Sequence, residues 1–164
     1  MNVYYLADVC SVIDRSPASA TGVTIRSVAE TDIPLLAETY LRAFGPAVVA
    51  SLTDAVADMT ATLGGAWGAV WPEASLAAWG AGDDLAGVVI VIRRPSWERA
   101  PDCPWVSDVF TDPRHRRSGV ARVLMGAACR VISAAGEPRV GLTVDDGNVA
   151  AITLYKSLGF SQSV

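Results

Sequence analysis

The feature that most constrains the fold is one long amphipathic helix between two strand-like segments. Across residues 120–132 the apolar side chains recur at intervals of three and four, which is the spacing of one buried helical face. Residues 105–111 before it are rich in β-branched and aromatic side chains, and residues 140–144 after it return to a strand pattern. Two strands joined in this way usually pair in parallel with a right-handed crossover. The sequence therefore predicts a parallel strand–helix–strand unit over residues 105–144.

The rest of the chain alternates between strand and helix patterns without an internal repeat. The small residues of 16–20 indicate a flexible join, so we divide the chain into an N-terminal strand and linker, 1–20, and a main domain, 21–164. The order of elements predicts a mixed α/β fold. The other expected strands are 3–7, 23–26, 75–79 and 85–92, and the other expected helices are 33–44, 48–63 and 148–158.

Composition narrows the classes of function. Hydrophobic residues make up 51% of the 164 residues and charged ones 18%, which suits a packed core and excludes a disordered chain. No stretch approaches the roughly 20 apolar residues of a membrane span, so we expect no membrane partner. The net charge of −4 disfavours nucleic acid as a partner, because phosphate contacts require a basic surface.

Cysteine and histidine are too few for a disulfide framework or a histidine-rich metal site. Cys10, Cys103 and Cys129 are far apart and odd in number, which fits a reducing compartment. His115 is the single histidine of the sequence. We therefore expect a cytoplasmic protein without a bound metal.

The strongest chemical signal is the turn P-R-H-R-R-S-G-V-A at residues 113–121, between a strand and the amphipathic helix. Gly119 and Ala121 are small residues at a helix start, where free backbone N–H groups and the helix dipole attract anions. The arginines of this turn reverse the acidic balance of the chain locally, so the turn suits a pyrophosphate. The alternative is a solvated arginine-rich turn whose glycine serves helix packing.

A second motif, N-x-x-A-x-x-L-Y-x-x-x-G-F at residues 148–160, favours the pyrophosphate site over the solvated turn. Together with R-R-S-G-V-A at residues 116–121 it resembles the GCN5-related N-acetyltransferase (GNAT) family. The first motif matches the pyrophosphate motif Q/R-x-x-G-x-G/A, with Ala121 in the last position. By motif the resemblance covers residues 105–160, and by its general strand–helix pattern it covers residues 24–44.

The resemblance implies a central, mixed and mostly antiparallel twisted sheet flanked by about four helices. It also implies an enzyme that moves an acetyl group from acetyl-CoA to a primary amine of a small molecule or protein, by direct attack. The alternative is a domain of the same fold that binds coenzyme A or its acyl form without turnover.

The resemblance further implies which residues bind acetyl-CoA. The end of strand 105–111 matches the segment that pairs with the pantetheine arm, and the turn matches the segment that wraps the pyrophosphate. Asn148 matches a position that often contacts the pantetheine, although it could equally be a plain helix N-cap. The implied coenzyme-binding residues are Val109, Phe110, Thr111, Arg116, Arg117, Ser118, Gly119, Val120, Ala121, Arg122 and Asn148.

Two residues are candidates for proton transfer. Tyr155 matches the tyrosine that protonates the departing thiolate in many family members; alternatively it is a half-buried core aromatic. Asp108 is the first candidate for the general base, and strand alternation places it on the same face as Phe110. That face could point into the core or away from the cleft. Thr143 stands where some members carry a basic glutamate, and the carboxylates of residues 145–146 lie in a turn.

Two other regions bear on the acceptor side. The family normally continues past the G-F with two strands, but only residues 161–164 remain here. Residues 2–8 look like the usual last strand, and we expect them to pair beside residues 140–144, in their own chain or swapped into a partner as a homodimer. Trp67 and Trp71 follow the helix of 48–63; we expect core packing, with stacking on an acceptor as the alternative.

Overall fold

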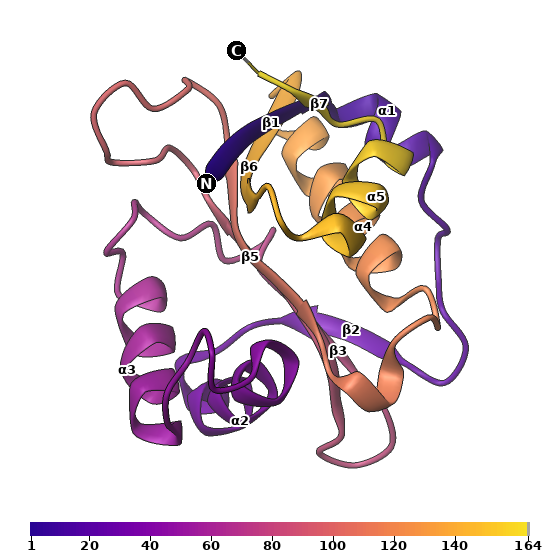
Figure 1. Ribbon diagram of the computed structural model, residues 1–164. Coiled ribbons are helices and arrows are strands. Elements are labelled where there is room, and N and C mark those ends of the chain that lie inside the picture. The colour runs from indigo at the N-terminus through magenta and orange to yellow at the C-terminus, as the bar shows by residue number, and fades with distance from the viewer. Residues whose placement is uncertain (164) are drawn as a thin grey trace.

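The expected strand–helix–strand unit is present in the computed structural model, which describes residues 1–163 (Figure 1). It consists of β5 (Trp105–Thr111), α4 (Val120–Ala134) and β6 (Arg139–Asp145). β5 and β6 pair in parallel through Trp105 opposite Gly141 and Val106 opposite Leu142. The prediction of a parallel pair around one helix is therefore confirmed.

All strands join one seven-stranded sheet in the order β2-β3-β4-β5-β6-β1-β7. Every other neighbouring pair in this order is antiparallel, which confirms the expected mixed and mostly antiparallel sheet. The remaining strands are β1 (Asn2–Asp8), β2 (Thr24–Ser27), β3 (Leu76–Trp79), β4 (Leu85–Ile92) and β7 (Ser161–Gln162).

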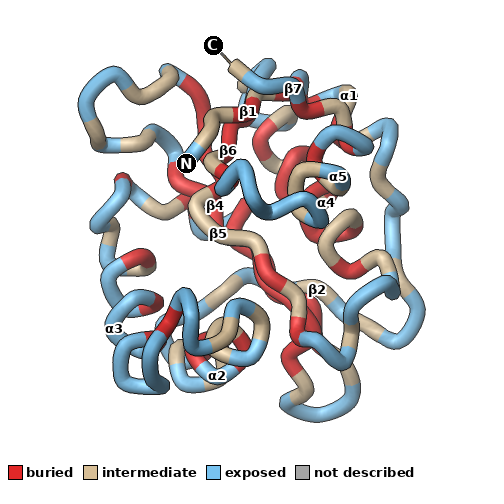
Figure 2. Tube along the Cα trace, viewed as in Figure 1, coloured by how far each residue is buried: buried red, intermediate tan, exposed pale blue. Residues whose placement is uncertain are grey.

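The helices cover both faces of the sheet, with α1, α4 and α5 on one side and α2 and α3 on the other (Figure 1). Figure 2 shows buried positions along the central strands and on parts of α3 and α4, while the connecting loops are mostly exposed. Two short 3-10 turns, Glu30–Asp32 and Pro113–His115, precede α2 and α4. The remaining helices are α1 (Val9–Asp14), α2 (Ile33–Phe44), α3 (Leu52–Leu63) and α5 (Val149–Ser157).

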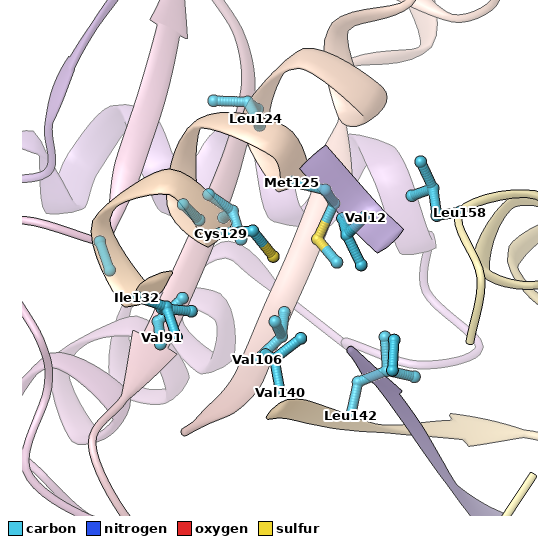
Figure 3. Close-up of a cluster of buried hydrophobic side chains, with 14 of the residues drawn as sticks. Val12, Val91, Val106, Leu124, Met125, Cys129, Ile132, Val140, Leu142 and Leu158 are labelled. Carbon is cyan, nitrogen blue, oxygen red and sulfur yellow. The ribbon is translucent and has the colours of Figure 1, made fainter. Parts of the chain in front are cut away.

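The helices differ from the sequence expectation in two places, one additional helix and one shifted boundary. α1 was not expected, because six residues are too few for a periodic pattern; its Val9 and Val12 are buried against the core. Figure 3 shows Val12 beside Met125 of α4, in the cluster that forms the main core. α3 begins at Leu52 rather than at 48, because the Ser51 side chain caps it by accepting a hydrogen bond from the amide of residue 54.

β1 occupies the sheet position that the sequence left open. It pairs antiparallel with β6 along its whole length, from Asn2 opposite Asp145 to Asp8 opposite Arg139, within the same chain. The expectation for residues 2–8 is therefore confirmed. The short β7, which was not expected, pairs with the other side of β1 through Ser161 and Gln162.

The sheet opens where β5 and β6 separate after their two paired residues. Ile90 of β4 faces Asp108 and the next residue, Val91, faces Val106, so Ser107 is an extra residue that forms a β-bulge. A bulge bends its strand. Within the described chain, the edge of β5 from residue 107 to 111 has no strand partner on the β6 side. This opening positions the candidate site.

No helix within residues 1–163 combines the length and the apolar character needed to cross a membrane.

Candidate functional site

A cavity of about 550 Å³, here named the α4 cavity, lies at the opening between β5 and β6. It contains every predicted coenzyme-binding residue except Ser118, and it also contains Tyr155. Ser118 is exposed, and its hydroxyl donates a hydrogen bond to the carbonyl of His115. The predicted coenzyme-binding residues other than Ser118 therefore line one cavity, and Ser118 lies outside that lining.

Several lining residues were missed. Ala43 and Phe44, at the end of α2, come from the opposite layer, and no local sequence signal indicates them. Ala151 and Leu154 lie on the α5 face that carries Tyr155, so helical spacing could have indicated them.

The N-terminus of α4 forms one wall of the α4 cavity. Gly119 adopts a left-handed conformation, with φ of 80°, as the residue preceding the helix. Among residues 1–163 no side chain caps this end, so its first N–H groups remain available to an anion. Ala121 adds only a methyl group to this wall. This wall of the α4 cavity is therefore open to an anionic ligand.

Three arginine side chains line the same cavity. Arg116 donates a hydrogen bond to the carbonyl of Ala43 at 2.8 Å, which ties the turn to the end of α2. Arg122 donates to the hydroxyl of Ser157 on α5. Arg117 is exposed and has a positive φ of 60°. These cations would favour a negatively charged ligand at the helix start.

Arg114 of the same turn has a different role. The fully buried Asp112 accepts hydrogen bonds from the Arg114 amide at 2.9 Å and from its Nε at 3.0 Å. Asp112 also accepts from Nε of Arg42 on α2 at 2.9 Å. Burial raises the pKa of this carboxyl, but these donors outweigh it and hold the pKa at about 2. Asp112 therefore anchors the turn to α2.

Asp84, in the loop between β3 and β4, adds a second anchor. It accepts a hydrogen bond from Arg114 at 2.9 Å, and its other oxygen lies 2.8 Å from Nε2 of His115. Two carboxylates, those of Asp84 and Asp112, therefore neutralise Arg114, so its guanidinium pairs within the protein rather than facing a ligand.

Tyr155 is a buried aromatic residue that also lines the α4 cavity. Its ring is 6% exposed and packs edge-on against Phe160, with centroids 5.8 Å apart, yet it lines the α4 cavity. Burial raises the pKa of the Tyr155 phenol well above its usual value, and the charge of Asp108 raises it further. The phenol therefore stays protonated near neutral pH and is available as a proton donor.

Asp108 lies on the face of the sheet that α2 and α3 cover. It is opposite Ile90 and shares a face with Phe110, as strand alternation predicted. Burial raises the pKa of Asp108 to about 6; the charge of Asp58 raises it too, and the Ser107 hydroxyl lowers it. Burial and then Asp108 also raise the pKa of Tyr40 on α2 to about 12. A carboxyl with a pKa near neutrality suits proton transfer.

The other polar candidates have structural partners. Asn148 accepts a hydrogen bond from the amide of Ala151 at 3.1 Å, so it is the N-cap of α5 as well as part of the lining. Asp145 and Asp146 are exposed and accept hydrogen bonds from the amine of Met1. Within residues 1–163 no group of three or more His, Cys, Asp or Glu side chains is placed to hold a metal ion.

A second cavity, of about 640 Å³ and here named the tryptophan cavity, meets β5 on the other side of Asp108. Ser107 lines the tryptophan cavity and Val109 lines the α4 cavity. Asp108 therefore lies between the two cavities along the strand.

Known proteins share both the sequence pattern and the fold. The sequence model described as the acetyltransferase (GNAT) family matches residues 43–160. A mycothiol acetyltransferase of Nocardiopsis dassonvillei is 47% identical over 53 residues, which cover 32% of this chain and 16% of that protein.

Solved structures extend the fold comparison to nearly the whole chain. A tandem GNAT protein from the clavulanic acid biosynthesis pathway matches with a TM-score of 0.70 and 16% identity, over 98% of this chain and 50% of that chain. An aminoglycoside N-acetyltransferase in complex with CoA matches with a TM-score of 0.65 and 18% identity, over 90% and 93% of the two chains.

This chain spans at most half the length of the mycothiol acetyltransferase and of the tandem protein. The family match nevertheless covers most of its residues, including β5, α4, β6 and α5. The chain therefore belongs to the acetyltransferase (GNAT) family.

Proposed function

We propose that this protein is an acetyl-CoA-dependent N-acetyltransferase that acts on a primary amine by direct attack. One observation carries the proposal. The uncapped start of α4, three arginines, the unpaired edge of β5 and a buried protonated tyrosine all meet in the α4 cavity. Each of these features suits a different part of an acyl-CoA ligand or of its reaction.

The ligand would lie along the cavity from the turn to the sheet opening. Backbone N–H groups at the start of α4, with Arg117 beside them, would hold the pyrophosphate. The free backbone groups of residues 109–111 would pair with the amides of the pantetheine arm, as a neighbouring strand would. Bound acetyl-CoA supplies an acetyl group as a thioester, which an amine can attack.

Two residues would move the protons. The Asp108 carboxylate would take a proton from the acceptor ammonium, because its pKa of about 6 leaves it largely ionised near neutral pH. The neutral amine nitrogen then bonds to the acetyl carbon while the carbon–sulfur bond breaks, and the second proton that the nitrogen loses to become an amide passes to solvent. Tyr155 would give its phenolic proton to the sulfur, and solvent would restore it.

A calorimetric titration with acetyl-CoA tests the binding half of the proposal. We expect saturable binding, weakened about tenfold or more in Arg117→Glu because a repulsive charge replaces a favourable one at the pyrophosphate. Arg99→Glu is the matched control, because Arg99 also has a positive φ, of 59°, and is 92% exposed in a different loop. Absence of binding at millimolar acetyl-CoA would contradict the proposal.

Turnover tests the catalytic half. Tyr155→Phe should keep the affinity for acetyl-CoA and reduce kcat about 100-fold, because general acid catalysis is typically worth at least that factor. Release of the coenzyme A thiol in the presence of primary amines would be measured. Binding without thiol release from any amine would assign the chain to the non-catalytic acyl-CoA binders instead.

The compartment is part of the same proposal. Cys10 is exposed and Cys103 and Cys129 are buried, and all three are free thiols in the structure. We propose a reducing, cytoplasmic location, in which these thiols remain reduced.

A further inference from the structure

The tryptophan cavity has a lining unlike that of the α4 cavity. Its volume of about 640 Å³ lies within the usual range for small-molecule sites. The N-terminal strand, two loops, β5, β6 and the end of the chain all contribute to it. The lining residues are Met1, Asn2, Val3, Tyr4, Trp67, Trp97, Trp105, Ser107, Thr143, Gln162 and Ser163.

The floor of this cavity is a packed aromatic cluster. Trp105 is 2% exposed, and its ring meets Tyr4 at 5.3 Å and Trp97 at 5.6 Å between centroids, both edge-to-face. Gly141 of β6 permits this arrangement, because a Cβ there would come within 2.2 Å of the Trp105 ring. The floor is therefore rigid and apolar before any ligand arrives.

Trp67 forms an exposed wall. Its side chain is 53% exposed, although indole is among the largest apolar side chains. The loop that carries it is held in place, since its carbonyl accepts a hydrogen bond from the amide of Ser96 at 2.9 Å. The next residue, Gly68, has a φ of 140°, and a Cβ there would lie 2.2 Å from the carbonyl oxygen of Arg94. A fixed, exposed indole at a cavity indicates a surface that a ligand covers.

The charged groups of the lining limit the class of ligand that it can bind. Among the described residues of the tryptophan cavity there is no Asp, Glu, Lys or Arg side chain. Its polar side chains include those of Asn2, Tyr4, Ser107, Thr143, Gln162 and Ser163. Met1 also lines the cavity, and its charged amine is already paired with Asp145 and Asp146. A ligand with several positive charges would lose its hydration there without gaining a carboxylate side chain of the lining as a partner. A neutral, flat and apolar group fits this lining better.

The position of the cavity connects it to the reaction. Asp108 lies between Ser107 in this lining and Val109 in the α4 cavity. Asp108 lines neither cavity, but it lies opposite Ile90 while Trp105 lies opposite Ile92, so both side chains project from the same face of the sheet. An amine whose apolar part rests against Trp67 would therefore direct its nitrogen toward the face that carries Asp108. Trp67, at 53% exposed, is outside the core. Trp71, in contrast, is only 5% exposed, and the guanidinium of Arg93 lies over its ring.

We propose that the acceptor is a primary amine bearing an aromatic group on a short chain, and that the tryptophan cavity binds this group by stacking against Trp67. This inference rests on the proposed acetyl transfer and adds the class of acceptor. It separates this chain from enzymes whose acceptors are polycationic sugars.

The test is a calorimetric titration with 2-phenylethylamine, run with and without coenzyme A so that no turnover occurs. We expect saturable binding, with Kd raised about tenfold in Trp67→Ala and largely retained in Trp67→Phe, because stacking needs an aromatic ring. Leu52→Ala is the control, since Leu52 is 45% exposed on α3 and lies outside both linings. Equal affinity in Trp67→Ala and wild type, or no binding at about 10 mM amine, would overturn the inference.

A turnover assay separates this inference from the proposed function. Acetyl transfer to 2-phenylethylamine in preference to kanamycin, with the preference lost in Trp67→Ala, would support both. Acetyl transfer to kanamycin alone would overturn the acceptor class and leave the acetyltransferase proposal intact. Binding of 2-phenylethylamine at Trp67 without transfer to any amine would support the site and overturn the enzyme.

Discussion

The two cavities that meet at β5 differ in how the chain assembles them. The α4 cavity takes nearly all of its lining from two short stretches, 109–122 and 148–155. The tryptophan cavity takes its lining from six separate places, which are 1–4, 67, 97, 105–107, 143 and 162–163. One site is therefore largely local in sequence, and the other exists only after the sheet has formed.

This difference explains which of the two could be recognised in advance. A helix start with free N–H groups is a property of a few consecutive residues, so a motif can indicate it. The tryptophan cavity requires β1 to lie against β6 and requires Trp97 of the loop at 93–104 to pack on Trp105. No run of residues carries that information.

We expect the largest effect from deleting residues 2–8. This deletion tests whether the strand that lines the tryptophan cavity is also needed for folding. The deletion removes the buried Tyr5 and Ala7 and leaves β6 as an unpaired apolar edge. We expect aggregation and no cooperative unfolding transition, measured by size-exclusion chromatography and urea unfolding.

Truncation after Phe160 is the control for this deletion. It removes residues 161–164, including β7, whose two residues are exposed, so the protein should remain folded. A soluble deletion protein that unfolds cooperatively would show that β1 is dispensable for folding and that the tryptophan cavity is separable from the fold.

Asp108→Asn, between the cavities, comes next. The folded carboxyl holds its proton to a pKa of about 6 against the ordinary 3.8, so the wild type loses stability as pH rises from about 4 through 6. The variant avoids this loss and should be more stable by about 3 kcal/mol at about pH 8, from urea unfolding. Its turnover should fall about 100-fold, and wild-type kcat/KM should rise with pH through about 6.

Asp102→Asn is the matched control, because Asp102 is 94% exposed and lies outside both linings. If Asp108→Asn keeps full turnover, another group is the base. If the variant is no more stable than wild type above pH 6, Asp108 is not buried as described.

The smallest effect expected is that of Asp112→Asn, which tests whether the α4 cavity depends on its own anchor. The folded pKa of about 2 lies below the ordinary 3.8, so this carboxylate stabilises the fold above pH 3.8 and the contribution is lost as pH falls through 2. We expect a loss of about 2 kcal/mol at neutral pH by urea unfolding.

The same variant should bind acetyl-CoA more weakly, because Arg42 and Arg114 no longer hold the turn. Calorimetry should show an unchanged affinity for 2-phenylethylamine. If the affinities for acetyl-CoA and 2-phenylethylamine fell equally, the structures of the two cavities would depend on each other, and the α4 cavity would not have an anchor of its own.

Sequence reasoning failed where a residue's role depends on distant partners. It counted Arg114 in the local positive charge of the turn but did not anticipate that Asp84, thirty positions earlier, and Asp112 pair with it. It missed α1, since six residues become a helix only when Val9 and Val12 find a core to enter. It expected Trp67 in the core. The position of Trp67 depends on how the loop after α3 contacts residues 92–96, and the local sequence does not specify these contacts.

Local sequence patterns were enough to predict the order of the longer strands and helices and the start of α4, because periodicity and free backbone groups at a helix end are set within a few residues. The resemblance to the family added most of the residues that line the α4 cavity. The carboxylates that neutralise Arg114, the environment of Asp108 and the meeting of three tryptophans at one cavity emerge only when the chain is folded. These depend on strand order and register, which join residues that the chain keeps far apart.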